Sequence, residues 1–137
     1  MPIKIAVLNN GNVVINHWIG DVTFDDLLEH DRKMLQDPSI VPGATVLTDT
    51  TKANAIDFEI DRIPEFIDIM KDPENKTAIA RFGLLVATEN LEVANAFADA
   101  TEKIGVPLVI FSSIDVAAVW VGVEPSVLIR TLTELGM

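Results

Sequence analysis

The stretch of residues 43–57 holds the side chains best suited to chemistry. Asp49 ends a run of apolar and small residues that predicts a buried strand, Thr50 and Thr51 follow it, and Asp57 precedes the next predicted helix. In open α/β sheets, ligands bind just beyond the carboxyl ends of the strands. A carboxylate at such an edge could act as a general acid or base, and a hydroxyl as a nucleophile, if a matched partner lies beside it. Asp49, Thr50 and Thr51 are therefore the first candidate site residues.

The two histidines, His17 and His30, do not supply that partner by their spacing. His17 lies in the middle of a predicted strand, and His30 lies on the polar side of a predicted helix. Neither stands at metal-ligand spacing from a carboxylate, and the chain lacks a His-x-x-x-His pair, a nucleophile elbow and a glycine-rich phosphate loop. We interpret both histidines as surface or partly hydrogen-bonded residues and Asp49 as a cap of its loop. We expect no metal and no cofactor.

Local patterns predict the elements that position these residues. Two β-rich runs, 3–8 and 13–19, flank an Asn-Gly pair, which predicts an antiparallel hairpin because Asn-Gly tolerates the positive φ angles of a tight turn. Thr23 with Asp26 is typical of a capping pair at a helix start. The helix that follows should end near Pro38, because the residue before a proline resists helical geometry.

The rest of the chain alternates strands with helices. Residues 44–49 predict the central strand, the second half of 77–87 the next strand, and 106–111 the fifth. The remaining helices are predicted to begin at Asp61, Thr88, Ser112 and Glu124-Pro125. The order β-β-α-β-α-β-α-β-α-α predicts one α/β domain over residues 1–137. Its mixed five-stranded sheet is mostly parallel with an N-terminal antiparallel hairpin, and four to five helices cover it.

Composition narrows the classes of function. With 21 acidic and 10 basic side chains, the formal net charge of −11 argues against nucleic-acid binding and against docking on an anionic membrane. The chain has no cysteine, which excludes disulfides, thiolate metal sites and cysteine nucleophiles. Its start lacks the pattern of a signal peptide, and no apolar run approaches the ~18 residues that a membrane span needs. We therefore expect a cytoplasmic protein without membrane insertion.

Three stretches of the sequence carry a family resemblance. They are the hairpin leading into Ile19-Gly20-Asp21-Val22-Thr23-Phe24-Asp25-Asp26-Leu27, the strand Val46-Leu47-Thr48-Asp49, and Leu108-Val109-Ile110-Phe111-Ser112-Ser113 followed by Ala117-Ala118-Val119-Trp120-Val121-Gly122. On these stretches the chain resembles the SpoIIAA-like proteins, whose fold is that of the STAS domain of bacterial anti-sigma-factor antagonists. The resemblance covers nearly the whole chain and implies a SpoIIAA-like, STAS-like fold.

The same resemblance bears on regulation. The phospho-regulated antagonists carry the phosphorylated serine in an Asp-Ser-Ser-Gly motif after the third strand. The corresponding stretch here is Ile56-Asp57-Phe58-Glu59, in which Phe58 replaces the serine and the glycine is absent. A shifted alignment brings Asp49-Thr50-Thr51 into comparison, and this stretch also lacks the glycine. The resemblance thus implies a non-catalytic regulatory or protein-interaction module without the phosphorylatable motif, and adds Asp57 and Phe58 to the candidate binding residues.

Three functional hypotheses remain open. The first is a STAS-type module that recognises a protein partner through the loop and helix after Asp49. The second is a protein that binds a small apolar ligand or lipid, motivated by Phe58, Ile60 and Phe66 near the strand ends. The third is a small hydrolase or isomerase that uses Asp49, Thr50 and His17 in one cleft. The amphipathic last helix either folds back on the domain or packs against a second copy, so a homodimer is a further expectation.

Overall fold

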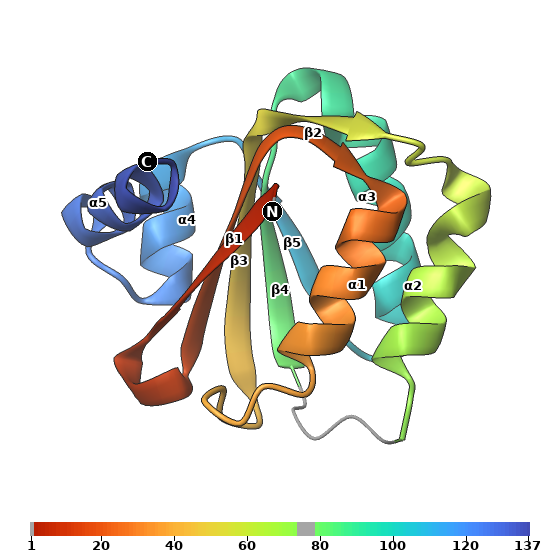
Figure 1. Ribbon diagram of the computed structural model, residues 1–137, viewed down its shortest axis with the longest axis horizontal. Coiled ribbons are helices and arrows are strands. Elements are labelled where there is room, and N and C mark those ends of the chain that lie inside the picture. Colours follow the sequence, from red (N-terminus) through yellow and green to blue (C-terminus); the bar gives the residue numbers. More distant parts are fainter. Residues whose placement is uncertain (1, 74–78) are drawn as a thin grey trace.

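The computed structural model describes residues 2–73 and 79–137, in which five strands form one mixed sheet (Figure 1). The strands are β1 (Ile3–Leu8), β2 (Val13–Thr23), β3 (Ala44–Ile56), β4 (Ile79–Leu85) and β5 (Leu108–Phe111). They lie side by side in chain order. β1 pairs antiparallel with β2 through the predicted hairpin, and every later pair is parallel.

Helices cover both faces of the sheet, as Figure 1 shows. α1 (Phe24–Met34), α2 (Ile63–Met70) and α3 (Leu91–Lys103) pack on one face, while α4 (Ile114–Val121) and α5 (Pro125–Leu135) pack on the other. Short 3-10 turns, η1 (Asn9–Gly11), η2 (Ile60–Arg62) and η3 (Thr88–Asn90), join some of these elements. The predicted order of elements, the hairpin and the α/β fold class are confirmed.

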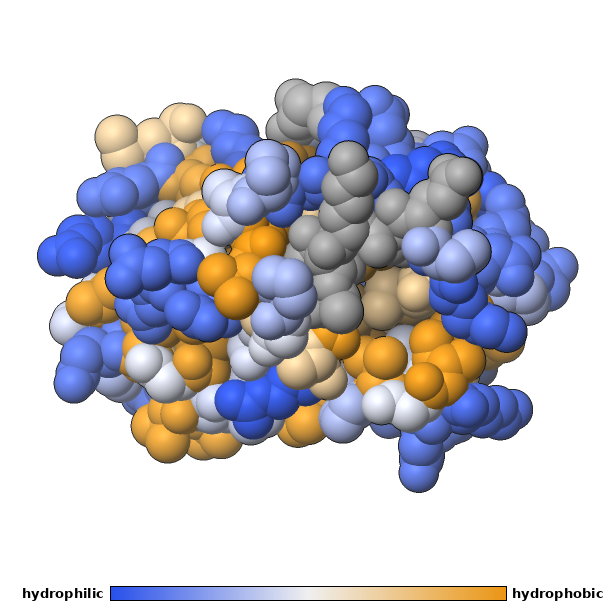
Figure 2. Space-filling model, turned by 90° about the horizontal axis from the view of Figure 1, so that it is seen from below, coloured by the Kyte–Doolittle hydropathy of each residue, from blue (hydrophilic) through white to orange (hydrophobic). Residues whose placement is uncertain are grey.

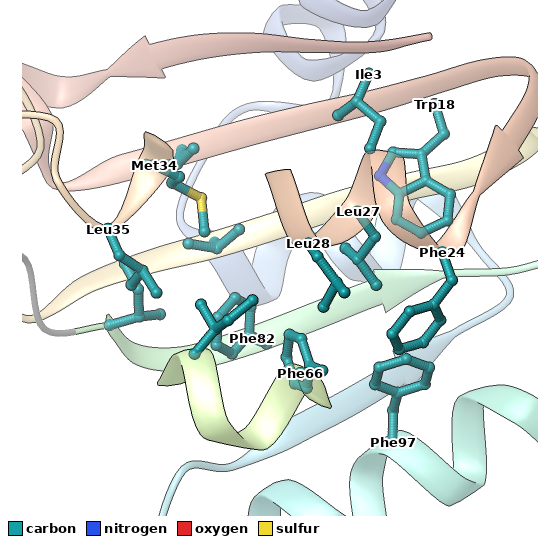
Figure 3. Close-up of a cluster of buried hydrophobic side chains, with 14 of the residues drawn as sticks. Ile3, Trp18, Phe24, Leu27, Leu28, Met34, Leu35, Phe66, Phe82 and Phe97 are labelled. Atoms are coloured by element: carbon teal, nitrogen blue, oxygen red, sulfur yellow. The ribbon is translucent and has the colours of Figure 1, made fainter. Parts of the chain in front are cut away.

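The larger core lies between the sheet and helices α1, α2 and α3 (Figure 3). Trp18 from β2, Phe24 and Leu28 from α1, Phe66 from α2 and Phe97 from α3 all point into it. The rings of Phe66 and Phe97 meet edge to face with their centroids 5.1 Å apart. Large aromatic side chains dominate the burial on this face, and they shape the space left between them.

The second core lies under α4 and α5. Leu128 and Leu132 of α5 are buried against the sheet, so the last helix folds back on its own domain. Gly83 of β4 lets α4 approach closely, because a Cβ atom there would lie 2.6 Å from Cζ3 of Trp120. Arg81 holds the same tryptophan: its guanidinium stacks 4.6 Å from the ring centroid, and Nη2 donates to the backbone carbonyl oxygen of Trp120 at 3.3 Å.

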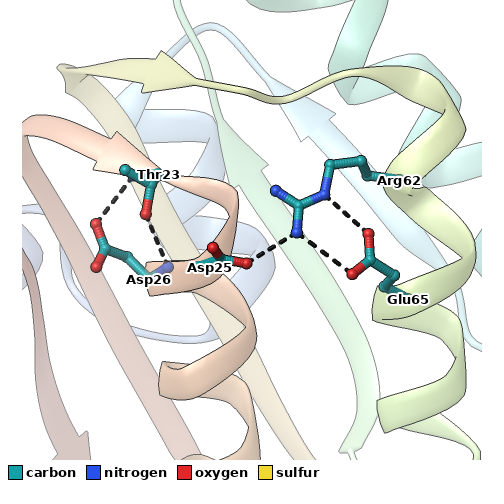
Figure 4. A network of polar contacts seen from close by, with 5 residues as sticks. All are labelled: Thr23, Asp25, Asp26, Arg62 and Glu65. Carbon is teal, nitrogen blue, oxygen red and sulfur yellow. Dashed lines mark hydrogen bonds and ion pairs between the residues drawn. The ribbon is translucent and has the colours of Figure 1, made fainter.

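Polar contacts fix the starts of α1 and α2 (Figure 4). Thr23 and Asp26 form the predicted capping box, in which Thr23 Oγ1 accepts from the Asp26 amide at 3.0 Å and Asp26 Oδ2 accepts from the Thr23 amide at 2.9 Å. Arg62 lies at the start of α2 and donates to Glu65 and to Asp25 of α1, both at 2.8 Å. These contacts tie the two helices together at one end of the larger core.

Strands β2 and β3 are longer than the sequence predicts. β3 does not stop at Asp49 but continues to Ile56, and β2 continues from Ile19 to Thr23. The two extensions pair with each other in parallel beyond an irregularity between His17 and Ile19. The predicted polar loop after Asp49 is therefore wrong, because this long-range pairing satisfies the backbone of residues that look loop-like in isolation.

Three predicted helix starts are displaced. Asp61 does not cap α2 but lies inside η2, and Thr88 opens η3, after which α3 begins beyond Asn90. The cap of α4 is Ser113, whose Oγ accepts from the amide of Val116, and not its neighbour Ser112. In each case a tight turn or the adjacent residue supplies the entry to the helix. Part of the predicted strand region 77–87 lies outside the described residues.

The surface is mixed in character. Viewed from below, at the end where β3 and β4 begin, hydrophilic residues predominate at the rim and hydrophobic residues lie between them (Figure 2). In the described part of the chain, no single helix combines the length and apolar composition needed to cross a bilayer. The bent pair of α4 and α5, which meet at 106°, passes that composition test only together.

Candidate functional site

A cavity of about 80 Å³ lies in the larger core, between the sheet and helices α1, α2 and α3. Most of its lining is apolar, and the larger members of this lining are Trp18, Leu27, Phe58, Phe66, Phe82 and Phe97. The polar members are Asn16, Asp31, Thr48, Thr50 and Asn90. Few polar groups in an otherwise apolar hollow are the usual composition of a small-molecule site.

Phe58 forms one edge of this cavity. It follows β3 and packs against three other rings, with centroids 5.2 Å from Phe24, 5.5 Å from Trp18 and 6.5 Å from Phe97. Asp57, just before it, has a left-handed backbone with φ of 61° and an exposed side chain. This sharp turn directs Phe58 back into the core and leaves Asp57 in solvent.

A buried polar cluster, formed by residues of β2, β3 and α1, borders the cavity. Oδ1 of Asn16 lies 3.0 Å from Nε2 of His30, and its Nδ2 donates to Thr48 Oγ1 at 3.4 Å and contacts Met34 Sδ at 3.7 Å. Burial, and then the nearby Lys33, lower the pKa of His30 to about 4. The imidazole is therefore neutral at pH 7 and serves as a hydrogen-bonding partner of Asn16.

Among the described residues, Asp31 is the one acidic side chain in the cavity lining. It lies on the buried side of α1, it is 4% exposed, and burial alone raises its pKa to about 8. Among the described residues, no hydrogen bond or ion pair to its carboxyl group is found. At pH 7 the group is mostly a neutral carboxylic acid that faces the cavity.

A second recess lies on the opposite face of the sheet, beside α4 and α5, with a volume of about 840 Å³. His17 and Asp49 line it from adjacent strands and are both 5% exposed. Nδ1 of His17 lies 3.3 Å from Oδ2 of Asp49, yet it makes no well-directed hydrogen bond within the described part of the chain. Asp49 Oδ1 instead accepts from the amide of Thr51 at 2.9 Å and from its hydroxyl at 2.7 Å.

The predicted site residues are thus divided between two faces. Asp49 and Thr51 belong to the recess beside α4 and α5, whereas Thr50 and Phe58 line the cavity under α1, α2 and α3. The hydroxyl of Thr50 donates to the carbonyl oxygen of Leu85 at 3.0 Å. Alternation along β3 causes this division, because successive side chains of a strand point to opposite faces. The hydrolase hypothesis needs Thr50 beside Asp49 and His17, and the sheet separates them.

Sequence reasoning left both histidines as either surface or partly hydrogen-bonded residues, and it missed Asp31. Both histidines are buried, so the surface alternative and the placement of His30 on the polar side of its helix are wrong. The hydrogen-bonded alternative is confirmed for His30, which lies beside Asn16, while His17 lies beside Asp49. Asp31 stands at helical spacing from Leu27, Leu28 and Leu35, which form the buried stripe of α1. An acid within the apolar stripe is a signal that the sequence itself contains. The described residues hold no group of three or more His, Cys, Asp or Glu side chains that could bind a metal ion.

Comparison with known proteins gives the fold. No protein-family model matches the chain, and no curated protein matches it significantly. Two solved structures are similar. One is an uncharacterized protein of the DUF3478 family with a SpoIIAA-like fold from Shewanella loihica PV-4, with a TM-score of 0.55 and 13% identity over 87% of this chain and 93% of that one. The other is the anti-sigma factor antagonist SpoIIAA in its unphosphorylated form, with a TM-score of 0.50 and 11% identity over 87% of this chain and 96% of that one.

Identities this low establish architecture and not a shared activity. The architecture of the chain agrees with both similar structures: it has the strand order β1 to β5, the antiparallel β1–β2 hairpin and helices on both faces of the sheet. The resemblance inferred from the sequence is confirmed at the level of fold: the protein has a SpoIIAA-like, STAS-like fold.

Proposed function

We propose that the protein is a non-catalytic binding module of STAS type whose ligand is a small apolar molecule held in the cavity under α1, α2 and α3. The observation that carries this proposal is the cavity itself, with its aromatic lining and few polar groups. The residue that occupies the place of the phosphorylatable serine in the sequence resemblance, Phe58, contributes a wall of this cavity. In this proposal, a binding role replaces a phosphorylation role at the position that corresponds in the sequence resemblance.

The size of the cavity sets the size of the ligand. An engineered cavity of ~150 Å³ in another protein binds benzene, so about 80 Å³ suits a molecule of only a few heavy atoms, or the end of a longer one. Empty core space of this volume costs about 2 kcal/mol of stability at the usual ~24 cal/mol per Å³. A ligand that fills the space recovers contacts that the empty core lacks.

The separation of the candidate catalytic groups supports a non-catalytic role. Thr50 faces the cavity and is occupied by a hydrogen bond to the backbone of β4, while His17 and Asp49 face the recess on the other side of the sheet. General acid or base catalysis needs its partners within hydrogen-bond reach of one substrate. A single substrate cannot reach both groups through a closed sheet.

The test is a binding titration with isobutanol, followed by nuclear magnetic resonance of the ¹⁵N-labelled protein. We expect the amide signals of cavity residues to shift in a saturable manner. Ala94 of α3 is buried and lines the cavity, so Ala94→Leu should fill the space and abolish these shifts. Ala98, partly exposed on the same helix and outside the lining, gives the matched control Ala98→Leu, which should bind as the wild type does. Equal binding by both variants would contradict the proposal.

A protein-interaction role is the second candidate, and exposed apolar residues after β3 favour it. Ile56 is 39% exposed and Ile60 is 51% exposed, on either side of the turn at Asp57. This segment corresponds, in the sequence resemblance, to the phosphoserine region of the antagonists. We expect Ile60→Asp to weaken capture of a partner from a lysate of the source cells, while Ile129→Asp, an equally exposed site on α5, leaves it unchanged. Equal loss in both variants would argue against recognition through this segment.

The expected homodimer stays a prediction. α5 is already packed on its own sheet, so it does not need a second copy to bury Leu128 and Leu132. Val119 of α4, 76% exposed, is the most exposed valine on that side of the domain. Sedimentation equilibrium of the wild type and of Val119→Asp tests the homodimer prediction. Dissociation of the dimer in the variant supports self-association through α4, and a monomeric wild type excludes a homodimer.

A further inference from the structure

The side chain of Asp31 occupies a core position of α1, and no described residue supplies a partner for its carboxyl group. It is 4% exposed and lines the cavity, and the described residues offer its carboxyl group no hydrogen bond and no counter-charge. Its neighbour His30 is buried to a similar degree but is bonded to Asn16 at 3.0 Å. The contrast matters because Asp31 lines the cavity, so a bound molecule can supply the hydrogen-bonding partner that its carboxyl group does not find in the fold.

The surroundings of Asp31 favour one class of ligand group. No lysine, arginine or histidine is among the residues that line the cavity in the described chain, so an anionic head group would find no counter-charge there. The rings of Trp18, Phe58, Phe66 and Phe97 line the same space, and aromatic faces attract cations. The formal net charge of −11 adds a field that draws cations toward the protein.

We propose that Asp31 is the recognition group of this cavity and that its ligand is a small hydrophobic amine, bound as the ammonium ion. The ammonium group donates to the carboxylate of Asp31, and the hydrocarbon part fills the space between the aromatic rings. This inference rests on the proposed function, because it requires that the cavity be occupied by a ligand. Beyond the proposed function, it specifies that the ligand carries a positive charge and donates hydrogen bonds.

Binding of an amine in this manner is coupled to proton release. Asp31 is the sole titratable residue in the cavity lining from β2, β3, β4, β5 and the three helices, within the described residues. The adjacent His30 is neutral and bonded to Asn16, and Arg32 and Lys33, which directly follow Asp31, are exposed. In the empty cavity at pH 7, Asp31 is mostly protonated. An ammonium ligand requires the ionised form, so its binding should release close to one proton.

The experiment compares three probes of one shape: isobutylamine as its cation, isobutanol as a neutral isostere, and isobutyrate as an anion. Each is titrated into the ¹⁵N-labelled protein at pH 7, and proton release is measured by calorimetry in two buffers of different ionisation enthalpy. We expect isobutylamine to bind at least tenfold more tightly than isobutanol and isobutyrate to bind weakest. Asp31→Asn should lower the affinity for isobutylamine tenfold or more and remove the proton release, while isobutanol binding changes less than twofold.

Asp99→Asn is the matched control, because Asp99 is exposed on α3 and lies outside the lining. It removes one negative charge without touching the cavity, so isobutylamine binding should stay within twofold of the wild type. Isobutanol binding without preference for the amine would refute the role of Asp31 and leave the proposed function intact. Preference for isobutyrate would likewise overturn the amine assignment. No binding of any probe would overturn the proposed function, and this inference with it.

Discussion

Replacing Asp31 by asparagine is expected to stabilise the protein at neutral pH while leaving its stability in acid nearly unchanged. In the folded protein burial raises the pKa of Asp31 from 3.8 to about 8. Asparagine has nearly the same shape and cannot ionise, so Asp31→Asn removes the titration and little else. The difference in free energy of unfolding between variant and wild type therefore isolates this one group from all other titrating residues.

The sign and size of the effect follow from proton linkage. Between pH 3.8 and about 8 the unfolded chain has released the Asp31 proton, whereas the folded protein still holds it. The free energy of unfolding of the wild type therefore falls as the pH rises through this window, by about 1.4 kcal/mol per pH unit from this residue. At pH 7 the accumulated loss is about 4 kcal/mol, a large part of the roughly 5–15 kcal/mol that stabilises a typical domain. Above about pH 8 both states are ionised and the loss becomes constant.

Urea unfolding followed by circular dichroism, repeated from about pH 4 to about pH 8.5, measures this difference directly. We expect Asp31→Asn and wild type to be nearly equal at the acid end, and the variant to be about 4 kcal/mol more stable at pH 7. Asp99→Asn, which removes an exposed carboxylate, should show no such growth with pH. A difference that stays flat across the range would refute the reasoning, because it would mean that Asp31 is already ionised and compensated in the folded protein.

Substitutions at Gly83, Thr23, Asp49 and Thr51 test the packing and the local hydrogen bonds by the same unfolding assay. Gly83→Ala places a Cβ atom 2.6 Å from the ring of Trp120 and should lower stability by roughly 1–3 kcal/mol, and an unchanged stability would show that α4 shifts freely on the sheet. Thr23→Ala removes one half of the capping box and should cost about 1 kcal/mol, with Thr23→Ser restoring most of it. Asp49→Ala removes the acceptor for two hydrogen bonds from Thr51 and should cost roughly 2 kcal/mol, whereas Thr51→Val, which deletes only the hydroxyl bond, should cost less.

Features determined by neighbouring residues were predictable from the sequence. The hairpin follows from Asn10-Gly11, whose residues take positive φ angles of 56° and 91° in the structure. The start of α1 follows from the reciprocal bonds of Thr23 and Asp26, and the end of α4 from the left-handed backbone of Gly122. Each of these signals depends on only a few consecutive residues. These signals can therefore be recognised without knowledge of the tertiary structure.

Features determined by distant pairing were not predictable in this way. Thr50 to Ile56 is rich in polar and small residues, which is typical of a loop, but it forms the second half of β3 because β2 extends alongside it. The partner segment contains Gly20 and Asp21, which also disfavour a strand when considered alone. Each segment becomes a strand only because the other satisfies its backbone. Local patterns in a single sequence do not show which distant segments pair with each other.

The candidate site combines both situations. The cavity has no local signature, because its lining comes from β2, β3, β4, β5 and three helices, and only their packing leaves the space. Asp31 does have a local signature, because it is an acid within the apolar stripe of Leu27, Leu28 and Leu35. Burying a carboxyl group among apolar side chains is costly unless the group finds a partner. Burial raises the pKa of Asp31 to about 8, so keeping an acid at this core position is expected to lower the stability of the protein at pH 7. Strain and unsatisfied polarity are expected at functional sites, so the residue that fits the fold least is the residue most informative about the ligand.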